Sequence, residues 1–65
     1  MLGKVKSFNK DKGYGFITSE SGEDYFFHYS ALQMDSFKTI EVGVDVEFEP
    51  EKTDRGLRAS KIVKL

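Results

Sequence analysis

Two short segments of the chain collect aromatic side chains at a spacing suited to stacking. Residues 12–17 read Lys-Gly-Tyr-Gly-Phe-Ile and residues 25–29 read Tyr-Phe-Phe-His-Tyr, and together they hold six of the nine aromatic residues of the sequence. On a β-strand Tyr14 and Phe16 share one face, because successive side chains alternate between faces. The neighbouring glycines leave the backbone uncluttered, so a flat nucleobase would have room against the rings. The pattern indicates a platform for base stacking.

The second aromatic segment divides between the two faces of its strand. Tyr25 and Phe27 share one face, whereas Phe26 and His28 share the other. An imidazole is costly to bury without hydrogen-bond partners, so we expect the face of His28 to be the exposed one. The predicted platform consists of the exposed rings on two neighbouring strands, Tyr14, Phe16, Phe26 and His28. We expect Lys4, Lys6 and Phe8 beside it on a third strand, unless a bulge near Ser7 reverses the alternation there.

The elements that must position these rings are short strands joined by turns. The expected strands are Gly3–Lys10, Tyr14–Glu20, Asp24–Tyr29, Val44–Glu49 and Leu57–Val63. We expect Ser30–Gln33 to form one helical turn capped by Ser30, Pro50 to end the fourth strand, and residues 51–56 to form a charged turn. Five strands with no long helix predict an all-β fold, a small five-stranded antiparallel barrel, since closure removes exposed edges.

The inward faces of these strands predict the core. Its expected members are Val5, Ile17, Tyr25, Phe27, Val44, Val46, Phe48 and Ile62. A buried aromatic side chain contributes roughly 1.5 to 3 kcal/mol to folding, and a small domain is only marginally stable. Leaving several rings outside therefore favours a function for them over a purely structural role.

Length and composition set the class of protein. The sequence of 65 residues, read as one domain over residues 1–65, contains no cysteine, so neither a disulfide framework nor a thiolate metal site is expected. No apolar run approaches the roughly 20 residues that a membrane-spanning helix needs, and no signal-peptide pattern is present. We expect a soluble, monomeric, cytoplasmic protein.

Charge is unevenly distributed although the net charge is only −1. The first seventeen residues hold four lysines and one acid, whereas residues 41–54 hold six acids around Lys52. The basic end coincides with the aromatic end, which would orient a polyanion. The alternative interpretation is ordinary solvated surface charge.

The sequence argues against an enzyme. It has one histidine, no hydroxyl residue with an evident base partner, no phosphate-binding loop and no metal-ligand spacing. We expect no metal, no cofactor and no small-molecule substrate. A module that binds peptides or a second protein through its aromatic face is the other alternative, and the slightly acidic balance agrees with it.

A set of motifs along the whole chain resembles the bacterial cold-shock domain proteins. They are Gly3-Lys4-Val5-Lys6, Phe8-Asn9, residues 12–17, Asp24-Tyr25-Phe26-Phe27-His28-Tyr29-Ser30-Ala31, Phe37-Lys38 and Arg55-Gly56. RNA-recognition motif domains share a similar Lys-Gly-Tyr-Gly-Phe pattern, but they need two helices that this chain lacks. The resemblance implies a barrel of the OB-fold type that binds single-stranded RNA and single-stranded DNA, often preferring pyrimidines, and that acts as an RNA chaperone under cold or general stress.

The resemblance also implies which residues would bind nucleic acid. The residues matching the family's stacking positions are Phe8, Tyr14, Phe16, Phe26, His28, Tyr29 and Phe37. The residues matching positions for phosphate contacts, base-edge contacts or their support are Lys6, Asn9, Lys12, Asp24, Lys38 and Arg55.

Four departures from the family pattern bear on binding. Ser7 stands where the family ordinarily has tryptophan, and losing one base stack costs roughly 1 to 3 kcal/mol, or about 5- to 150-fold in affinity. Tyr25 and Phe27 replace smaller aliphatic residues, which implies a rearranged core or a partly exposed Tyr25.

Residues 34–36 replace a stretch that commonly contains glycine. Residues 57 and 58 replace a turn that usually contains proline, and Arg58 would restore some attraction for phosphate. We therefore expect weaker binding than in typical relatives.

Overall fold

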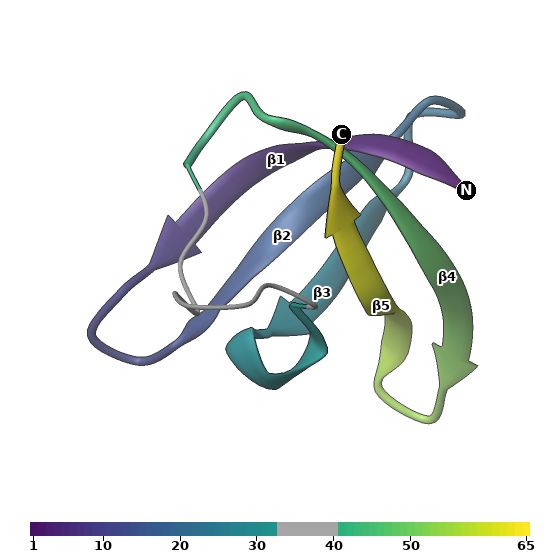
Figure 1. The fold of residues 1–65 in the computed structure, drawn as a ribbon. Coiled ribbons are helices and arrows are strands. Elements are labelled where there is room, and N and C mark those ends of the chain that lie inside the picture. Colours follow the sequence, from purple (N-terminus) through teal and green to yellow (C-terminus); the bar gives the residue numbers. More distant parts are fainter. Residues whose placement is uncertain (33–40) are drawn as a thin grey trace.

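Five strands close into a small barrel in the computed structural model, which describes residues 1–32 and 41–65 (Figure 1). The strands are β1 (Leu2–Asn9), β2 (Tyr14–Ser19), β3 (Asp24–His28), β4 (Asp45–Thr53) and β5 (Gly56–Lys64), and one 3₁₀ turn, η1, spans Tyr29–Ala31. Around the barrel the order is β1-β2-β3-β5-β4, and β4 pairs with β1. The predicted all-β barrel of OB-fold type is confirmed.

One pairing in the barrel is parallel. Neighbouring strands run antiparallel except β3 and β5, which pair in parallel at Phe26 and Arg58. A ring with an odd number of strands cannot alternate direction at every step, so one parallel pair is a consequence of closing five strands. The parallel bridge between Leu32 and Ile62 continues this junction. We call the junction between β3 and β5 the seam.

Several predicted boundaries were wrong, most of all the end of β4. β4 continues through Pro50 to Thr53, because proline is tolerated near a bulge and the β4–β5 register shifts between Glu47 and Glu49. The charged turn therefore shrinks to residues 54–55, where the Thr53 hydroxyl donates to the Gly56 carbonyl at 2.9 Å. The helical turn starts earlier than predicted, and His28 rather than Ser30 is its N-cap.

The barrel interior contains most of the predicted core. Among the described residues, the buried hydrophobic side chains are Val5, Ile17, Tyr25, Phe27, Leu32, Val46, Phe48, Ala59 and Ile62. Val44, predicted to be in the core, is only partly buried against it. Tyr25 is 4% exposed, and its ring centroid lies 5.1 Å from that of Phe48. The two larger aromatics on β3 are thus accommodated by the core, and Tyr25 does not emerge from it.

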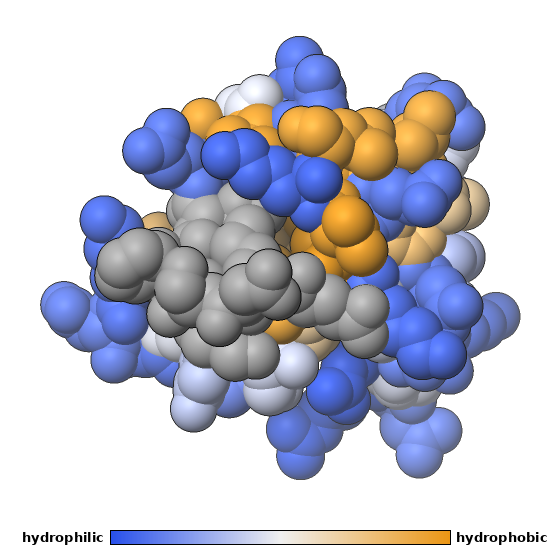
Figure 2. Space-filling model, viewed as in Figure 1, coloured by the Kyte–Doolittle hydropathy of each residue, from blue (hydrophilic) through white to orange (hydrophobic). Residues whose placement is uncertain are grey.

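Exposed hydrophobic side chains lie both near the ends of the described sequence and away from them. Figure 2 shows a mainly hydrophilic face with an apolar patch on the side where Figure 1 places the two chain ends. Large hydrophobic residues exposed near the ends of the chain are Met1, Leu2, Val63 and Leu65. Phe16, Phe26 and Tyr29 are exposed as well, and these three residues are not close to either end of the sequence.

Candidate nucleic-acid interface

A bulge in β1 decides which of its side chains face outward. The register shifts between Val5, which pairs with Ile17, and Ser7, which pairs with Phe16. Ser7 therefore shares the open face with Phe16, and the next residue, Phe8, turns inward opposite Gly15. Simple alternation, which put Phe8 on the open face, was wrong, and the alternative of a bulge near Ser7 is confirmed.

Phe8 supports the interface from beneath. It is partly buried against the core, and its ring is stacked on that of Phe27 with centroids 5.7 Å apart and planes at 5°. The stack fixes the end of β1 against β3. Phe8, one of the residues predicted to stack on bases, is thus already engaged in a ring stack within the barrel.

The predicted platform residues Tyr14, Phe16, Phe26 and His28 lie on one face of β2 and β3, as strand alternation predicted, but Tyr14 and His28 are partly buried there. The β2–β3 register pairs Tyr14 with His28 and Phe16 with Phe26. Phe16 is 39% exposed and Phe26 is 37% exposed, with ring centroids 5.8 Å apart in an edge-to-face arrangement. Tyr14 lies 5.7 Å from Phe26 between centroids. Two exposed rings thus stand on neighbouring strands whose other faces are buried, which holds them in a fixed relation.

The glycines between these aromatics serve packing and do not clear space for a ligand. A Cβ atom on buried Gly15 would clash with the Ser7 carbonyl oxygen and would lie 2.9 Å from the Phe8 Cα atom. A Cβ atom on Gly13 would lie 2.6 Å from Cδ1 of Tyr29. The prediction that the glycines leave room for a base was wrong, because they make room for Phe8 and Tyr29.

His28 is held by the turn that follows it. The backbone N–H of Ser30 donates to Nδ1 of His28 at 3.3 Å, and the Ser30 hydroxyl lies 3.1 Å from the same nitrogen. A backbone N–H can only donate, so Nδ1 accepts and the neutral imidazole carries its proton on Nε2. The ring of Tyr29, which is 41% exposed, lies 4.3 Å from that of His28 between centroids. This pair extends the aromatic surface beyond the ends of β2 and β3.

The turn between β1 and β2 places basic side chains next to Tyr29. Oδ1 of Asn9 accepts hydrogen bonds from the backbone N–H groups of Asp11 at 3.0 Å and Lys12 at 3.1 Å. The backbone N–H of Tyr29 donates to the Gly13 carbonyl at 2.7 Å. Lys10, Lys12 and Tyr29 line the same surface hollow. Asn9 therefore shapes the turn that presents Lys12, a supporting role among those that the family resemblance implied.

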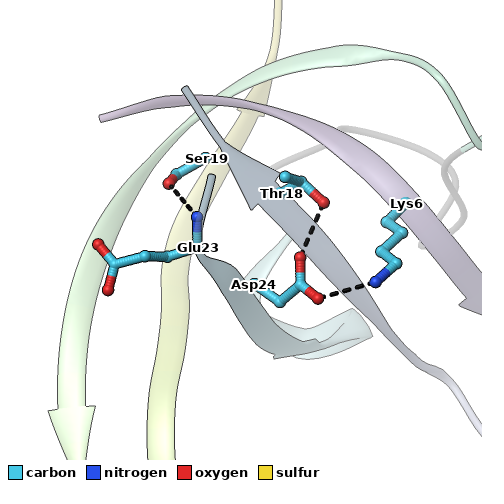
Figure 3. A network of polar contacts seen from close by, with 5 residues as sticks. All are labelled: Lys6, Thr18, Ser19, Glu23 and Asp24. Atoms are coloured by element: carbon cyan, nitrogen blue, oxygen red, sulfur yellow. Dashed lines mark hydrogen bonds and ion pairs between the residues drawn. The ribbon is translucent and has the colours of Figure 1, made fainter. Parts of the chain in front are cut away.

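Lys6 and Asp24 bind each other at the edge of the platform (Figure 3). Nζ of Lys6 donates to Oδ2 of Asp24 at 2.8 Å, and the Thr18 hydroxyl donates to Oδ1 at 2.9 Å. The hydrogen bond from Lys6 and, after it, the one from Thr18 lower the pKa of Asp24 below its ordinary value. The positive charge of Lys6 is thus balanced locally in the free protein.

A groove connects the platform to the β4–β5 hairpin. Its volume is about 670 Å³, and it is lined by Phe16, Phe26, Thr53, Asp54, Arg55, Leu57 and Arg58. The hairpin thereby brings Arg55 to the rings, although Arg55 follows Phe16 by 39 positions and Phe26 by 29 in the sequence. Arg58, which pairs with Phe26 across the seam, was not among the predicted site residues. The parallel pairing that places it there depends on how the barrel closes, so the strand pattern carries no signal for it.

One row of residues crosses the outer face from strand to strand. Ser7 on β1 pairs with Phe16 on β2, Phe16 pairs with Phe26 on β3, and Phe26 pairs with Arg58 on β5. We call these four residues the central row. It begins with a small hydroxyl side chain, passes through two exposed rings and ends with a guanidinium group.

Other expectations are only partly covered by the structure. Phe37, Lys38 and the departure at residues 34–36 lie outside the described residues. In residues 1–32 and 41–65, no group of three or more histidine and acidic side chains could hold a metal ion. Nor does any helix in these two ranges have the length and apolar character to span a membrane.

Comparisons with known proteins assign the chain to a family. The family described as 'Cold-shock' DNA-binding domain matches residues 1–65. Cold shock protein 1 of Lactiplantibacillus plantarum is 57% identical over 61 residues, which cover 94% of this chain and 92% of that protein. Cold shock protein CspB of Bacillus caldolyticus is 52% identical over 63 residues, which cover 97% and 96% of the two chains.

A solved structure agrees with these relatives. The structure titled drosophila Unr CSD456 superposes with a TM-score of 0.80 at 28% identity, covering 98% of this chain and 26% of the other. The barrel, the sequence relatives and the family match all confirm the predicted resemblance. The chain belongs to the cold-shock DNA-binding domain family, a family of nucleic-acid-binding proteins.

Proposed function

We propose that this protein binds single-stranded RNA and single-stranded DNA by stacking bases on the platform, and that it acts as a monomeric RNA chaperone in the cytoplasm during cold or general stress. The observation that carries the proposal is the pair Phe16 and Phe26, which are 39% and 37% exposed at paired positions on β2 and β3. Stacking on aromatic rings tolerates different sequences because every base has a flat face. The names of the relatives, cold shock proteins, support the physiological setting.

The proposed mechanism is electrostatic capture followed by stacking. Lys12, Arg55 and Lys38 attract the phosphate backbone, Lys6 joins them where a phosphate replaces Asp24 as its partner, and successive bases then stack on the exposed rings. Bases held in this way cannot pair with a second strand. Binding therefore shifts a hairpin toward its single-stranded form by mass action, with no chemical energy input. A duplex binds poorly because its bases already stack on one another.

Titration with short oligonucleotides tests the proposal. Single-stranded pyrimidine and purine heptamers should quench tyrosine fluorescence and bind, whereas a duplex of the same length should bind much more weakly. With three or four phosphate contacts, the logarithm of the affinity should fall with the logarithm of salt concentration at a slope of roughly −2 to −3. Equal binding of all three ligands would contradict stacking. Absence of oligonucleotide binding together with self-association would favour a protein-interaction module.

A double substitution locates the site. Phe16→Ala combined with Phe26→Ala removes two stacking surfaces, each worth roughly 1 to 3 kcal/mol, so affinity should fall by at least about 25-fold while the barrel stays folded. Val63→Ala is the matched control, because Val63 is 42% exposed near the C-terminal end of the chain and is not among the residues that line the groove beside the rings. Unchanged affinity in the double variant would move the site elsewhere.

A further inference from the structure

We propose that the β5 end of the central row is a base-selective subsite that prefers guanine, with Arg58 as the residue that reads it. The inference rests on the proposed single-strand binding and adds a specificity to it. It would depart from the pyrimidine preference that the family resemblance implies. The observations behind it are the position of Arg58, the composition of the groove and the absence of a ring at position 7.

Arg58 is placed to contact a base that stacks on Phe26. The two residues are register partners across the seam, and both line the groove together with Phe16. Within the described part of the chain, the ion pairs use Lys4, Lys6 and Lys61 and include neither Arg55 nor Arg58. The guanidinium of Arg58 is therefore available to an incoming ligand, whereas the charge of Lys6 is already balanced.

The chemistry of an arginine fork favours guanine. A guanidinium group presents parallel N–H donors that match two adjacent acceptors, and guanine offers such a pair in O6 and N7. Thymine and uracil lack it, because an N–H group separates their two carbonyl oxygens. Adenine places a donor beside N7. Cytosine has adjacent acceptors but a smaller ring face to lay on Phe16 and Phe26.

Asp54 favours a base over a phosphate in this groove. Its carboxylate lines the groove beside Arg55 and Arg58, where it would repel a phosphate group. The Watson–Crick edge of guanine, which is open in a single strand, carries N–H donors that a carboxylate accepts. Guanine thus complements both signs of charge that line the groove.

The β1 end of the central row offers a bound base less stacking surface. Ser7 is exposed and has no ring, so a base there has only Phe16 to stack on. The strongest contacts available to a single base therefore lie between Phe16, Phe26 and Arg58. A larger purine gains most from that position.

A substitution scan tests the inference. A heptamer of deoxythymidine is compared with heptamers in which one position at a time is deoxyguanosine, deoxycytidine or deoxyadenosine, for the unsubstituted protein and for Arg58→Lys. At one position guanine should bind about 5- to 10-fold more tightly than thymine, the lower end of what a bidentate contact supplies, because the groove is open to solvent. Arg58→Lys keeps the charge but not the fork, so it should lose this preference, and its affinity for the guanine-containing heptamer should fall more than its affinity for the thymidine heptamer.

Arg55→Lys is the matched control, since Arg55 lines the same groove. It should keep the guanine preference. The inference is overturned if no position prefers guanine, if cytosine is preferred to guanine, if the preference survives in Arg58→Lys, or if Arg55→Lys abolishes it instead. In each of these cases the proposed function still stands, provided that the thymidine heptamer binds. Failure of every oligonucleotide to bind would remove the proposed function itself.

Discussion

In the proposed binding mode, two single residues would determine how strongly the central row binds a base. Ser7 stands opposite Phe16 on the open face, so it leaves one flank of that ring uncovered. Arg58 at the other end adds a charge and a hydrogen-bonding fork. In the proposed binding mode, the side chains at the two ends of the row would set affinity and selectivity, while the rings between them would supply a surface that any base can use.

Ser7→Trp should strengthen binding of single-stranded oligonucleotides. The indole would lie beside Phe16 on the same face and would add one base stack, worth roughly 1 to 3 kcal/mol, so we expect about a tenfold gain in affinity for a thymidine heptamer. Fluorescence titration measures it, with Ser7→Ala as the control that adds no ring. An affinity equal to that of the control would show that position 7 does not contact the bound strand.

Asp24→Asn should lower stability at neutral pH but not in acid. Because the pKa of Asp24 is lowered in the folded state, its carboxylate contributes stability above the ordinary value of 3.8, and this contribution is lost as pH falls through the folded value. The urea midpoints of the variant and the unsubstituted protein should differ at pH 7 and converge from about pH 4 downward. Glu20→Gln, which removes an exposed carboxylate outside this network, is the control. A difference that stays constant between neutral and acid pH would contradict the role of the Lys6 hydrogen bond.

The residues of the platform could be predicted from the sequence because alternation on two adjacent strands assigns Tyr14, Phe16, Phe26 and His28 to one face. The pairing of Lys6 with Asp24 could not, since the two come from β1 and β3 and meet across β2. Alternation gives the face of a side chain but not its neighbours two strands away. For the same reason the availability of Arg58 and the engagement of Lys6 were visible only in the structure.

At the scale of elements, the bulge in β1 is the feature on which the platform depends. It turns Ser7 outward and Phe8 inward within two residues, and Gly15 on β2 provides the space that Phe8 needs. A bulge could be anticipated near Ser7 but not located, because it adds one residue without a distinctive sequence. The end of β4 was misjudged for a related reason, since Pro50 sits close to a second irregularity in the ladder.

Two glycine substitutions distinguish a site where a Cβ atom would clash, Gly15, from a site where only the positive φ favours glycine, Gly22. Gly15→Ala should destabilise the barrel by about 1–3 kcal/mol because β1 must move away from β2, and it should also weaken oligonucleotide binding through Phe16. Gly22 has a φ of 90° with nothing near its Cβ position, so Gly22→Ala should cost about 1 kcal/mol and leave affinity unchanged. Urea unfolding and titration measure both. Equal effects of the two substitutions on binding would show that the Gly15 contact does not position the platform.

For the whole molecule, closing five strands has a consequence that no single strand reveals. Strand alternation predicted the all-β barrel and most of its core. Which two strands form the seam is determined only by the order of all five strands around the barrel. β4 pairs with β1, so β5 is left beside β3 and must run parallel to it. The groove with Arg55 and Arg58 exists only because of this arrangement.

β3 and β5 have the fewest register partners of any neighbouring strands in the barrel. They share one pair, Phe26 and Arg58, before the bridge from Leu32 to Ile62. Local opening should therefore start there, and amide hydrogen exchange in the free protein should be faster at the seam than between β1 and β2. A nucleotide held by both Phe26 and Arg58 would join the two strands from outside. Saturation with a guanine-containing heptamer should then slow exchange at the seam more than elsewhere, whereas uniform slowing would mean that the ligand does not bridge it. The bound nucleic acid would then act as an additional, reversible link between β3 and β5.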